Sequence, residues 1–346
     1  MILINEQMRG SVFRGTMTQI SRRRFISIAA AAAGLSVVPG LPGLSTASLT
    51  RWRGRALGAD ASITLVAPDR ARAQALIAAA RAEIERLEAI FSLFRDDSVL
   101  TRLNREGRLD NPPFDLIELL SLAGRVHRLT GGAFDPTVQP LWAAYANRFS
   151  RPQECVAGGG EAIFAARERI GWQWVEAGPE AIGFSRPGMG LTLNGIAQGY
   201  ATDKVAELLR ADGMGQVLVE VGEIRALGEH PHGRPWEVAI AAPPGASAET
   251  GATVDLIDRA IATSAPRGTS FDADGVLGHI LDPRTGRPGG RWRQVSVLAD
   301  TAAMADGLST GFCLMEEAAI AGALREVPGT TARLVGKNGP PLLIDA

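Results

Sequence analysis

The residue types best suited to chemistry gather near the C-terminal end of the chain. A polar turn carries His279 and Asp282, and the apolar segment that follows contains Asp306 and Thr310. Asp306 and Thr310 are four residues apart, so on a helix they share one face. Oxygen ligands beside a titratable imidazole suit magnesium-assisted chemistry on a phosphate group. The sequence therefore predicts a site for phosphate chemistry in this stretch.

Asp306 is the strongest single candidate. It is the only charged residue between positions 301 and 315, where the apolar pattern predicts a helix. Asp300 or Thr301 would cap this helix, so Asp306 lies too far inside it to be the N-cap. A carboxylate among apolar residues is costly unless it is paired or bound to a metal. A hydrogen-bonded buried Asp and an exposed helix face are the alternatives, and Thr310 one turn later favours the metal.

His279 is the candidate base, because an imidazole exchanges protons near neutral pH. The alternative is a turn histidine that is bonded to the backbone. Arg267, Arg284 and Arg287 flank the turn and could neutralise phosphates, although we expect at least one of them to be a solvated surface residue.

Two glycine-containing segments are further candidates for phosphate or ligand binding. At residues 193–199 a predicted strand passes through a small-residue turn into a helix, and amides at a helix start attract phosphate oxygens. Taken alone, these glycines have an ordinary steric explanation, and the pattern matches neither the Rossmann fingerprint nor the P-loop. The glycine-rich approach to Asp135-Pro136-Thr137 suggests a binding loop, whereas the tripeptide is also typical of a plain turn.

The predicted elements mix helices and strands without a steady βαβ repeat. Helices are predicted over residues 70–94, 114–129, 195–209 and 301–315, with a shorter segment around 100–104. A strand with glycine breaks is predicted over residues 52–66. Further strands are predicted over residues 190–193, 217–227, 236–241, 253–258, 260–263 and 293–298, followed by a hairpin over 332–344. Residues 152–161 and 243–251 are expected to be loops. This order favours an α+β fold with mixed or antiparallel sheets and packed helices over a doubly wound parallel sheet.

The composition is that of a soluble globular enzyme, with 346 residues, of which 46% are hydrophobic and 21% charged. The net charge is −1, and the first 47 residues contribute five arginines against one glutamate, so the remainder is near −5. Nothing indicates a broad basic surface, and we expect no nucleic-acid partner. The two cysteines, Cys155 and Cys313, could pair in an oxidising compartment but make no disulfide framework.

The N-terminus is predicted to be a targeting segment over residues 1–47, ahead of one domain over residues 48–346. Three arginines at 22–24 precede an apolar, alanine-rich run and a small-residue site at 45–47, as in a cleavable signal. The Arg22-Arg23 pair favours a twin-arginine signal, so we expect a folded protein exported to the periplasm. The run is too short and weak for a membrane span, and no stable membrane insertion of the mature chain is expected. A basic, unstructured leader is the alternative.

The ordered set of motifs resembles the ApbE family of FAD:protein FMN transferases, from residue 52 to the end of the chain. The similar segments are, in order, residues 103–104, 131–138, 193–203, 223–228, 262–264, 279–286 and 305–310. No single segment decides the resemblance, but the ordered set is specific. Residues 193–200 (LNGIAQGY) are most similar to the branch that contains NosX, the accessory factor of nitrous-oxide respiration, and the twin-arginine leader agrees with that branch.

The resemblance implies an ApbE-like, T-fold-like architecture with an FAD cleft. It also implies an enzyme that binds FAD and Mg²⁺, cleaves the pyrophosphate, passes FMN to a Thr or Ser hydroxyl of a target protein and releases AMP. The implied partner is a periplasmic acceptor flavoprotein with an FMN-binding domain, NosR-like in this branch.

The resemblance also implies roles for particular residues. Asp306 and Thr310 would ligate the metal through their side chains, and Ala197 through its backbone carbonyl. His279, or a neighbouring carboxylate such as Asp282, would help to deprotonate the attacking hydroxyl. The residues expected to bind FAD are Phe134, Asp135, Thr137, Asn194, Gly195, Gln198, Thr263, Ser264 and Arg284.

Departures from the family pattern leave two other functions open. Much of the family has Asp, Gly and Lys where this chain has Thr192, Asn194 and Gln198, so a positive charge near the phosphates is lost. The first alternative is an FAD pyrophosphatase, which would use the same site with water as acceptor. The second is a non-catalytic flavin-binding accessory protein for assembly of a respiratory enzyme. The loss at Gln198 supports the second, whereas Asp306 and Thr310 oppose it, because binding flavin alone needs no metal.

Overall fold

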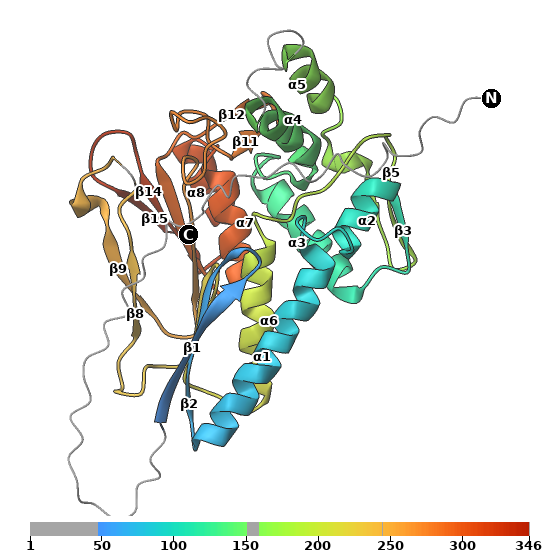
Figure 1. Ribbon diagram of the computed structural model, residues 1–346. Coiled ribbons are helices and arrows are strands. Elements are labelled where there is room, and N and C mark those ends of the chain that lie inside the picture. Colours follow the sequence, from blue (N-terminus) through green and yellow to red (C-terminus); the bar gives the residue numbers. More distant parts are fainter. Residues whose placement is uncertain (1–47, 151–158, 244, 346) are drawn as a thin grey trace, which may run out of the picture.

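An eight-stranded antiparallel sheet is the frame of the fold (Figure 1). The computed structural model describes residues 48–150, 159–243 and 245–345. Every pair of neighbouring strands in the sheet is antiparallel. The α+β class expected from the sequence is confirmed. In sheet order the strands are β1 (Ser48–Ala56), β2 (Ala59–Ala67), β6 (Val217–Val221), β7 (Ile224–Leu227), β10 (Ala260–Ser264), β13 (Gln294–Ala299), β14 (Thr331–Val335) and β15 (Leu342–Asp345).

Two segments predicted as strands, residues 52–66 with glycine breaks and residues 217–227, are hairpins, and left-handed turns explain both. Residues 52–66 turn at Leu57 and Gly58, whose φ angles are +48° and +78°. Residues 217–227 turn at Gly222, whose φ is +88°. Glycine adopts this backbone conformation without steric cost, so a glycine inside a strand pattern can reverse the chain. The second turn places Glu223 at a hairpin tip, where it is buried.

Three helices cover one face of this sheet (Figure 1). They are α1 (Arg70–Phe91), α6 (Ala197–Ala211) and α7 (Ala302–Phe312), and their apolar sides form the main core with the inward side chains of the strands. The Asp69 side chain caps α1, and the Thr301 side chain caps α7 by accepting from the third N–H group after it. Of the two caps expected for α7, Asp300 and Thr301, the structure therefore has Thr301.

A separate hairpin packs on the opposite face of the sheet. It is formed by β8 (Trp236–Ile240) and β9 (Ala252–Leu256). Its apolar side chains join Ile224 of β7 and Ile261 of β10 in a second core. The middle strands of the main sheet are thus buried on both faces, which fixes their register and the position of the β6–β7 turn.

The remaining elements surround one end of this layered structure (Figure 1). No helix in the described ranges is both long enough and apolar enough to cross a membrane. The other elements are α2 (Val99–Glu106), α3 (Phe114–Leu129), α4 (Gln139–Ser150), α5 (Gly159–Arg167) and α8 (Glu317–Leu324); the sheet of β3 (Arg108–Asp110), β5 (Ala181–Phe184) and β4 (Val175–Ala177); the hairpin of β11 (Leu281–Asp282) and β12 (Arg287–Pro288); and the 3₁₀ helices η1 (Pro136–Val138), η2 (Trp172–Trp174) and η3 (Ala248–Thr250).

Residues 190–193 are not a strand, contrary to the prediction. The Asn104 side chain bonds both backbone groups of Leu191, donating to its oxygen at 2.8 Å and accepting from its nitrogen at 2.7 Å. The next N–H, that of Thr192, donates to Pro136 O at 2.8 Å. A side-chain amide and a loop carbonyl therefore satisfy the backbone that a neighbouring strand would otherwise satisfy.

Three helices, α4, α5 and α8, are not anticipated by the sequence pattern. α5 begins within the loop expected at 152–161, so that expectation is wrong for residues 159–161. Residues 151–158, which hold Cys155, and the predicted leader at residues 1–47 lie outside the described residues.

α6 and α7 run antiparallel and pack unusually closely. A Cβ atom on Gly199 of α6 would lie 2.3 Å from Ala302 O and 2.7 Å from the Cα atom of Ala303. Real atoms do not approach to these distances, so only glycine permits the contact. At the other end of the contact, Gly195 adjoins Thr310 of α7.

We expect Gly199→Ala to lower the free energy of unfolding by about 2–3 kcal/mol, because α7 must move away from α6 to admit the methyl group. Urea unfolding followed by circular dichroism measures the change. Gly215→Ala is the control, since a Cβ there meets nothing within 4 Å, and it should change stability by less than about 0.5 kcal/mol. Equal stability of the two variants would contradict the close packing.

Candidate active site

Two buried carboxylates tie α6 and α7 together. Asp203 of α6 accepts hydrogen bonds from the N–H groups of Ala302 and Ala303, at 2.8 and 2.9 Å. Asp306 of α7 accepts one from Gly199 N–H, in the first turn of α6, at 3.1 Å. The first amides of a helix lack partners within it and carry partial positive charge, so each carboxylate stabilises the N-terminus of the other helix. Asp306 is therefore buried and hydrogen-bonded, not exposed on a helix face.

The structure brings Asp306, Thr310 and Ala197 to one junction. Ala197 is the first residue of α6. Thr310 Oγ1 lies 3.0 Å from the position that a Cβ atom would take on Gly195, two residues before Ala197. Asp306 bonds Gly199, two residues after Ala197. α7 thus presents one carboxylate and one hydroxyl along the first turn of α6.

The junction is electrostatically negative. Burial raises the pKa of Asp306 to about 7, against the opposing effect of the Gly199 hydrogen bond. Burial and the nearby Asp306 charge raise the pKa of Glu223 well above its usual value. In the ranges that the structure describes, no lysine or arginine forms an ion pair with either carboxylate. A bound cation would supply the positive charge that the side chains here do not.

The oxygen donors at this junction fit Mg²⁺. Asp306 offers a carboxylate, Thr310 a hydroxyl and Ala197 a backbone carbonyl, and Mg²⁺ prefers oxygen ligands while keeping several positions for water or phosphate. No group of three or more His, Cys, Asp or Glu side chains that could hold a metal occurs among residues 48–150, 159–243 and 245–345. Among the three candidate ligands only Asp306 is a His, Cys, Asp or Glu side chain. The protein would therefore supply few ligands, and substrate oxygens would complete the coordination.

Three loops converge on residues 309–311 of α7, and each holds residues predicted to bind FAD. Ser264 Oγ, at the end of β10, lies 2.8 Å from Ser309 Oγ and 3.3 Å from Thr310 Oγ1. Gly195 adjoins Thr310, and Phe134 Cβ lies 3.1 Å from the position of a Cβ atom on Gly311. The convergence places one residue from each of three predicted FAD-binding segments around a single helical turn.

Thr263, the neighbour of Ser264, is oriented into the sheet. Its hydroxyl donates to Ser296 Oγ at 2.9 Å, and its backbone N–H donates to Glu223 Oε2 at 3.3 Å. Thr263 therefore positions the Glu223 carboxylate, while a direct contact between its hydroxyl and FAD stays a prediction.

The Asp135 loop is a closed hydrogen-bonded unit. Asp135 Oδ1 accepts from the Thr137 N–H at 2.8 Å and from its hydroxyl at 2.6 Å. Thr137 Oγ1 also accepts from Gly171 N–H at 2.8 Å, and Thr137 is completely buried. Burial raises the pKa of Asp135, although these hydrogen bonds oppose the rise. The structure gives Thr137 a role in fixing the loop, and its contact with FAD stays a prediction.

His279 lies in the turn before β11 and is half-buried. Its backbone N–H donates to Thr269 O at 3.0 Å, and its ring Nδ1 lies 3.1 Å from the same oxygen. A carbonyl oxygen only accepts, so Nδ1 carries the proton and the neutral ring has Nε2 as its basic nitrogen. This geometry anchors the turn and also orients the imidazole.

Asp282 and Arg284 form a closed pair. Arg284 donates from Nε and Nη2 to the two carboxylate oxygens at 2.9 and 3.0 Å, and from its backbone N–H at 2.9 Å. Burial alone would raise the pKa of Asp282, but these hydrogen bonds outweigh it and lower the pKa below its usual value. Asp282 is therefore a weak base. Arg284 also donates to Leu314 O at 3.0 Å, so its guanidinium is engaged within the protein.

Gln198 and Asn194 differ in their surroundings. Gln198 Nε2 donates to Leu57 O at 3.5 Å, and a Cβ atom on Gly222 would lie 2.7 Å from Gln198 Cδ. Gln198 thus rests between the β1–β2 and β6–β7 turns. Asn194 is exposed, directly before Gly195. Both FAD contacts stay predictions.

Glu223 and Asp203, for which the sequence predicts no role, lie beside the candidate ligands. Asp203 also pairs with Arg225 at 2.7 Å, and all three residues are buried. The sequence does contain a pattern that could have identified Glu223, because this carboxylate follows Gly222 between two apolar strand segments. Asp203 gives no such signal, because polar residues on α6 are ordinary until the partner helix is known.

The raised pKa of Asp306 predicts a pH dependence of stability without divalent cations. Its folded-state pKa of about 7 exceeds the unfolded value of about 3.9. The folded state therefore binds more protons between these values, and the free energy of unfolding falls as pH rises through that range. Asp306→Asn cannot ionise, so above about pH 7 it should exceed the wild type in stability by on the order of 1–3 kcal/mol.

Urea unfolding in the presence of a chelator, at about pH 4 and about pH 8, measures the difference in free energy of unfolding between Asp306→Asn and the wild type. This difference should be smaller at the lower pH. Asp255→Asn, at an exposed position of β9, is the matched control and should follow the wild type. Parallel pH profiles for Asp306→Asn and the wild type would contradict the raised pKa.

Comparison with known proteins places this chain in a family. A family model described as the ApbE family matches residues 57–334. An FAD:protein FMN transferase from Klebsiella pneumoniae (strain 342) is 28% identical over 86% of this chain and 87% of its own length. A protein of the same name from Vibrio cholerae serotype O1 is 34% identical over 68% of this chain and 71% of its own length.

Solved structures with similar names share the fold. The flavin transferase ApbE from Vibrio cholerae superposes with a TM-score of 0.74 at 28% identity, covering 86% of this chain and 97% of that one. The apo flavinyl transferase ApbE from Pseudomonas stutzeri gives a TM-score of 0.73 at 28% identity, with coverages of 86% and 95%. The matched segment contains the whole α6–α7 junction and every loop that converges on it, and this chain belongs to the ApbE family.

Proposed function

We propose that this protein is a Mg²⁺-dependent FAD:protein FMN transferase that releases AMP. The observation that carries the proposal is the buried Asp306 carboxylate, held against the N-terminus of α6 one turn from the Thr310 hydroxyl. A negative, oxygen-lined junction accommodates a divalent cation, and the adjoining helix start suits phosphate oxygens. The names of the relatives support the transfer of FMN from FAD to a protein.

Asp306, Thr310 and the Ala197 carbonyl would hold the metal ion. When bound, Mg²⁺ would neutralise charge on the pyrophosphate of FAD and so favour attack at phosphorus. The contribution of the chain is positional. The Gly199–Asp306 hydrogen bond and the close helix contact hold the carboxylate in place before any substrate arrives, which reduces the reorganisation needed during the reaction.

The reaction joins a protein hydroxyl to the FMN half of FAD. The oxygen of a Thr or Ser side chain forms a bond to the phosphorus of that half, and the bond from this phosphorus to the bridging oxygen breaks. AMP leaves with the bridging oxygen, and the hydroxyl proton passes to the base. His279 Nε2 suits this role better than Asp282, because Thr269 orients the ring whereas Arg284 lowers the basicity of Asp282.

The convergent loops around residues 309–311 would bind FAD. Gly195, Ser264 and Phe134 each reach this turn of α7 from a different segment. Asp135 and Thr137 would act by keeping the Phe134 loop rigid. Gln198, Asn194, Thr263 and Arg284 complete the proposed set, with Arg284 acting mainly through its pair with Asp282.

The cellular setting is a proposal from the sequence. The arginines at 22–24 support export through the twin-arginine route to the periplasm, and residues 193–200 support the NosX-like branch. The acceptor would then be a periplasmic flavoprotein with an FMN-binding domain, NosR-like if the branch is right. A nitrous-oxide reductase cluster among the neighbouring genes would support that acceptor.

Asp306→Ala should abolish FMN transfer and weaken Mg²⁺ binding, because it removes the one carboxylate of the candidate metal site. FMN-binding domains are incubated with enzyme, FAD and Mg²⁺, and mass spectrometry detects the FMN adduct. Calorimetry measures the affinity of the enzyme for Mg²⁺. Asp255→Ala is the control and should transfer as the wild type does. Transfer by Asp306→Ala at the wild-type rate would remove Asp306 from the metal site.

The same assay separates the two other functions. Release of AMP without an FMN adduct on any of several acceptors would indicate an FAD pyrophosphatase. Bound FAD with neither AMP release nor an adduct would indicate a non-catalytic flavin carrier. The transferase proposal requires AMP and adduct in equal amounts.

His279→Ala should lower kcat by about 10²–10⁴-fold while changing the Kd for FAD much less, as expected for a general base. Single-turnover transfer and FAD fluorescence titration measure the two effects. Thermal unfolding provides the control for the lost hydrogen bond to Thr269. An equal loss of rate and FAD affinity would assign His279 to the structure of the turn alone.

A further inference from the structure

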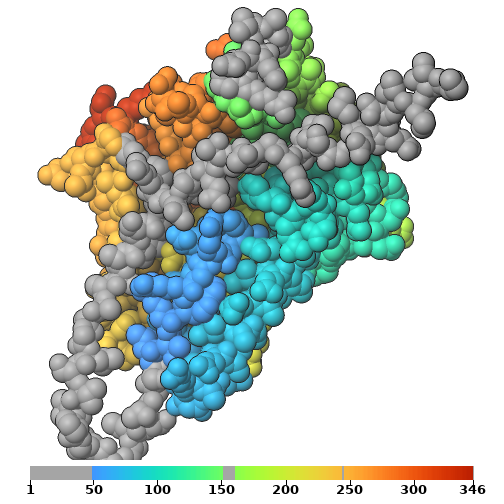
Figure 2. Space-filling model, viewed as in Figure 1, coloured from blue at the N-terminus to red at the C-terminus, as the bar shows by residue number. Residues whose placement is uncertain are grey.

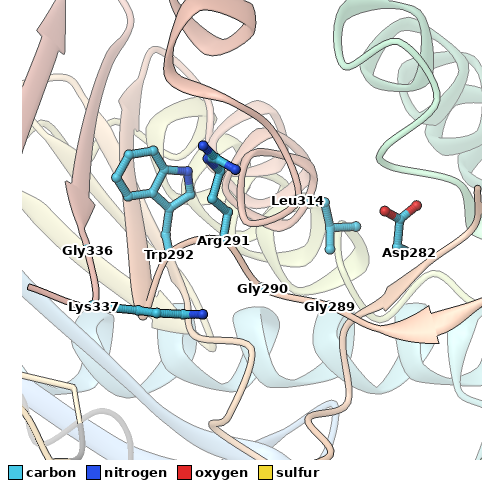
Figure 3. A pocket seen from close by; sticks show the side chains of 8 residues that line it. All are labelled: Asp282, Gly289, Gly290, Arg291, Trp292, Leu314, Gly336 and Lys337. Atoms are coloured by element: carbon cyan, nitrogen blue, oxygen red, sulfur yellow. The ribbon is translucent and has the colours of Figure 1, made fainter. Parts of the chain in front are cut away.

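A groove beside the candidate active site has no part in the reaction described above (Figure 3). Its volume is about 620 Å³, and it is open to solvent. Residues 289–292, between β12 and β13, form its floor and one wall. Gly336 and Lys337 of the β14–β15 turn, together with Asp282 and Leu314, complete the lining.

The groove adjoins the turn that carries His279 and the end of α7. Asp282 lines it and lies three residues after His279. Leu314 lines it as well and follows Thr310 by one helical turn, and its carbonyl accepts the hydrogen bond from Arg284. A molecule that lies in the groove therefore lies beside the turn that carries the candidate base and beside the C-terminal end of α7.

The floor of the groove is glycine backbone. Figure 3 shows Gly289 and Gly290 between Trp292 on one side and Leu314 on the other. A Cβ atom on Gly289 would lie 2.7 Å from Leu314 Cδ2, so a side chain there would require the Leu314 side chain to move. Trp292 is held in place because its Nε1 donates to Met315 O at 3.0 Å. A bare floor beside a fixed aromatic wall suits an extended polypeptide, whereas small ligands are usually enclosed.

Positive charge exceeds negative charge around the groove. The Arg284 charge offsets that of Asp282, and Arg291 pairs with Glu316. Lys337, whose side chain points toward the glycine floor in Figure 3, forms no ion pair with any described residue. The excess charge therefore lies on a lysine directed into the groove.

A second unpaired cation borders the groove. A Cβ atom on Gly290 would lie 2.7 Å from Pro266 Cβ, so the loop that carries Arg267 adjoins the floor. Arg267 is exposed and has no ion pair within the described ranges. Two uncompensated cations favour a negatively charged occupant.

We propose that this groove docks the acceptor protein, which lays an extended acidic segment along it with the hydroxyl-bearing residue directed to His279. The proposal rests on the proposed transferase function and adds the surface and the charge by which the acceptor is recognised. Lys337 and Arg267 attract the segment, the glycine floor admits its backbone, and Trp292 packs against its apolar side chains. FAD occupies the separate convergence of loops on residues 309–311.

The test uses the full chain and two fluorescent peptides that differ only in charge. Each has one central Thr in an otherwise uncharged sequence, flanked by Asp in one peptide and by Lys in the other. The wild type should bind the Asp peptide at least about tenfold more tightly, and Lys337→Glu should reduce this preference by about tenfold. Arg102→Glu, the same charge change at an exposed position of α2, should keep the preference. FAD affinity should be unchanged in both variants.

Each other outcome has a defined meaning. Equal binding of the two peptides to the wild type, or an unchanged preference in Lys337→Glu, would overturn the docking proposal. A loss of FAD affinity in Lys337→Glu with unchanged peptide binding would also overturn it, by assigning the groove to the nucleotide. If the wild type shows the charge preference but yields neither AMP nor an FMN adduct with any acceptor, the transferase function fails while the docking surface stands.

Discussion

The reciprocal contact between α6 and α7 is the constraint on which the rest of the site depends. Each helix directs a buried carboxylate at the first turn of the other, Asp203 to α7 and Asp306 to α6. Gly199 lets the two backbones approach closely enough for both sets of hydrogen bonds to form. Separating the helices would leave the buried Asp306 carboxylate without a donor and Asp203 with Arg225 alone, which costs more than the net value of a hydrogen bond. Sterics and electrostatics therefore enforce the same geometry.

Burial of the carboxylates between α6 and α7 also sets the electrostatics of the candidate metal site. Burial raises the pKa values of both Asp306 and Glu223, and the nearby Asp306 charge raises that of Glu223 further. A bound cation would offset this negative charge, and because the protein supplies few ligands of its own, substrate oxygens could complete the coordination. The antiparallel pairing of β7 with β10 brings the Glu223 turn and Ser264 to the same side of α7. The sheet thus brings Glu223 and Ser264, which do not belong to the helices, close to α7.

The two substrates of the proposed reaction need different kinds of site, and the fold offers both. Loops from three distant segments close around one turn of α7 and would hold FAD. The groove over Gly289 and Gly290 is open, carries more positive than negative charge and adjoins the His279 turn through Asp282, which suits a protein acceptor. The Asp282–Arg284 pair joins the turn to Leu314, just after α7, through the Arg284–Leu314 hydrogen bond. Asp282 therefore has a structural explanation that does not need it to act as a base.

Sequence alone determined what depends on neighbours along the chain. Helix periodicity located α3 with its bounds, a cap expected at Asp300 or Thr301 located the start of α7, and four-residue spacing put Asp306 and Thr310 on one face. Tertiary structure decided what depends on distant residues. Asn104 satisfies the backbone of Leu191, so residues 190–193 need no neighbouring strand. Arg284 lowers the pKa of Asp282, and burial together with the Asp306 charge raises the pKa of Glu223. Hydrogen-bond partners and burial come from segments far apart in the sequence, so no local pattern contains them.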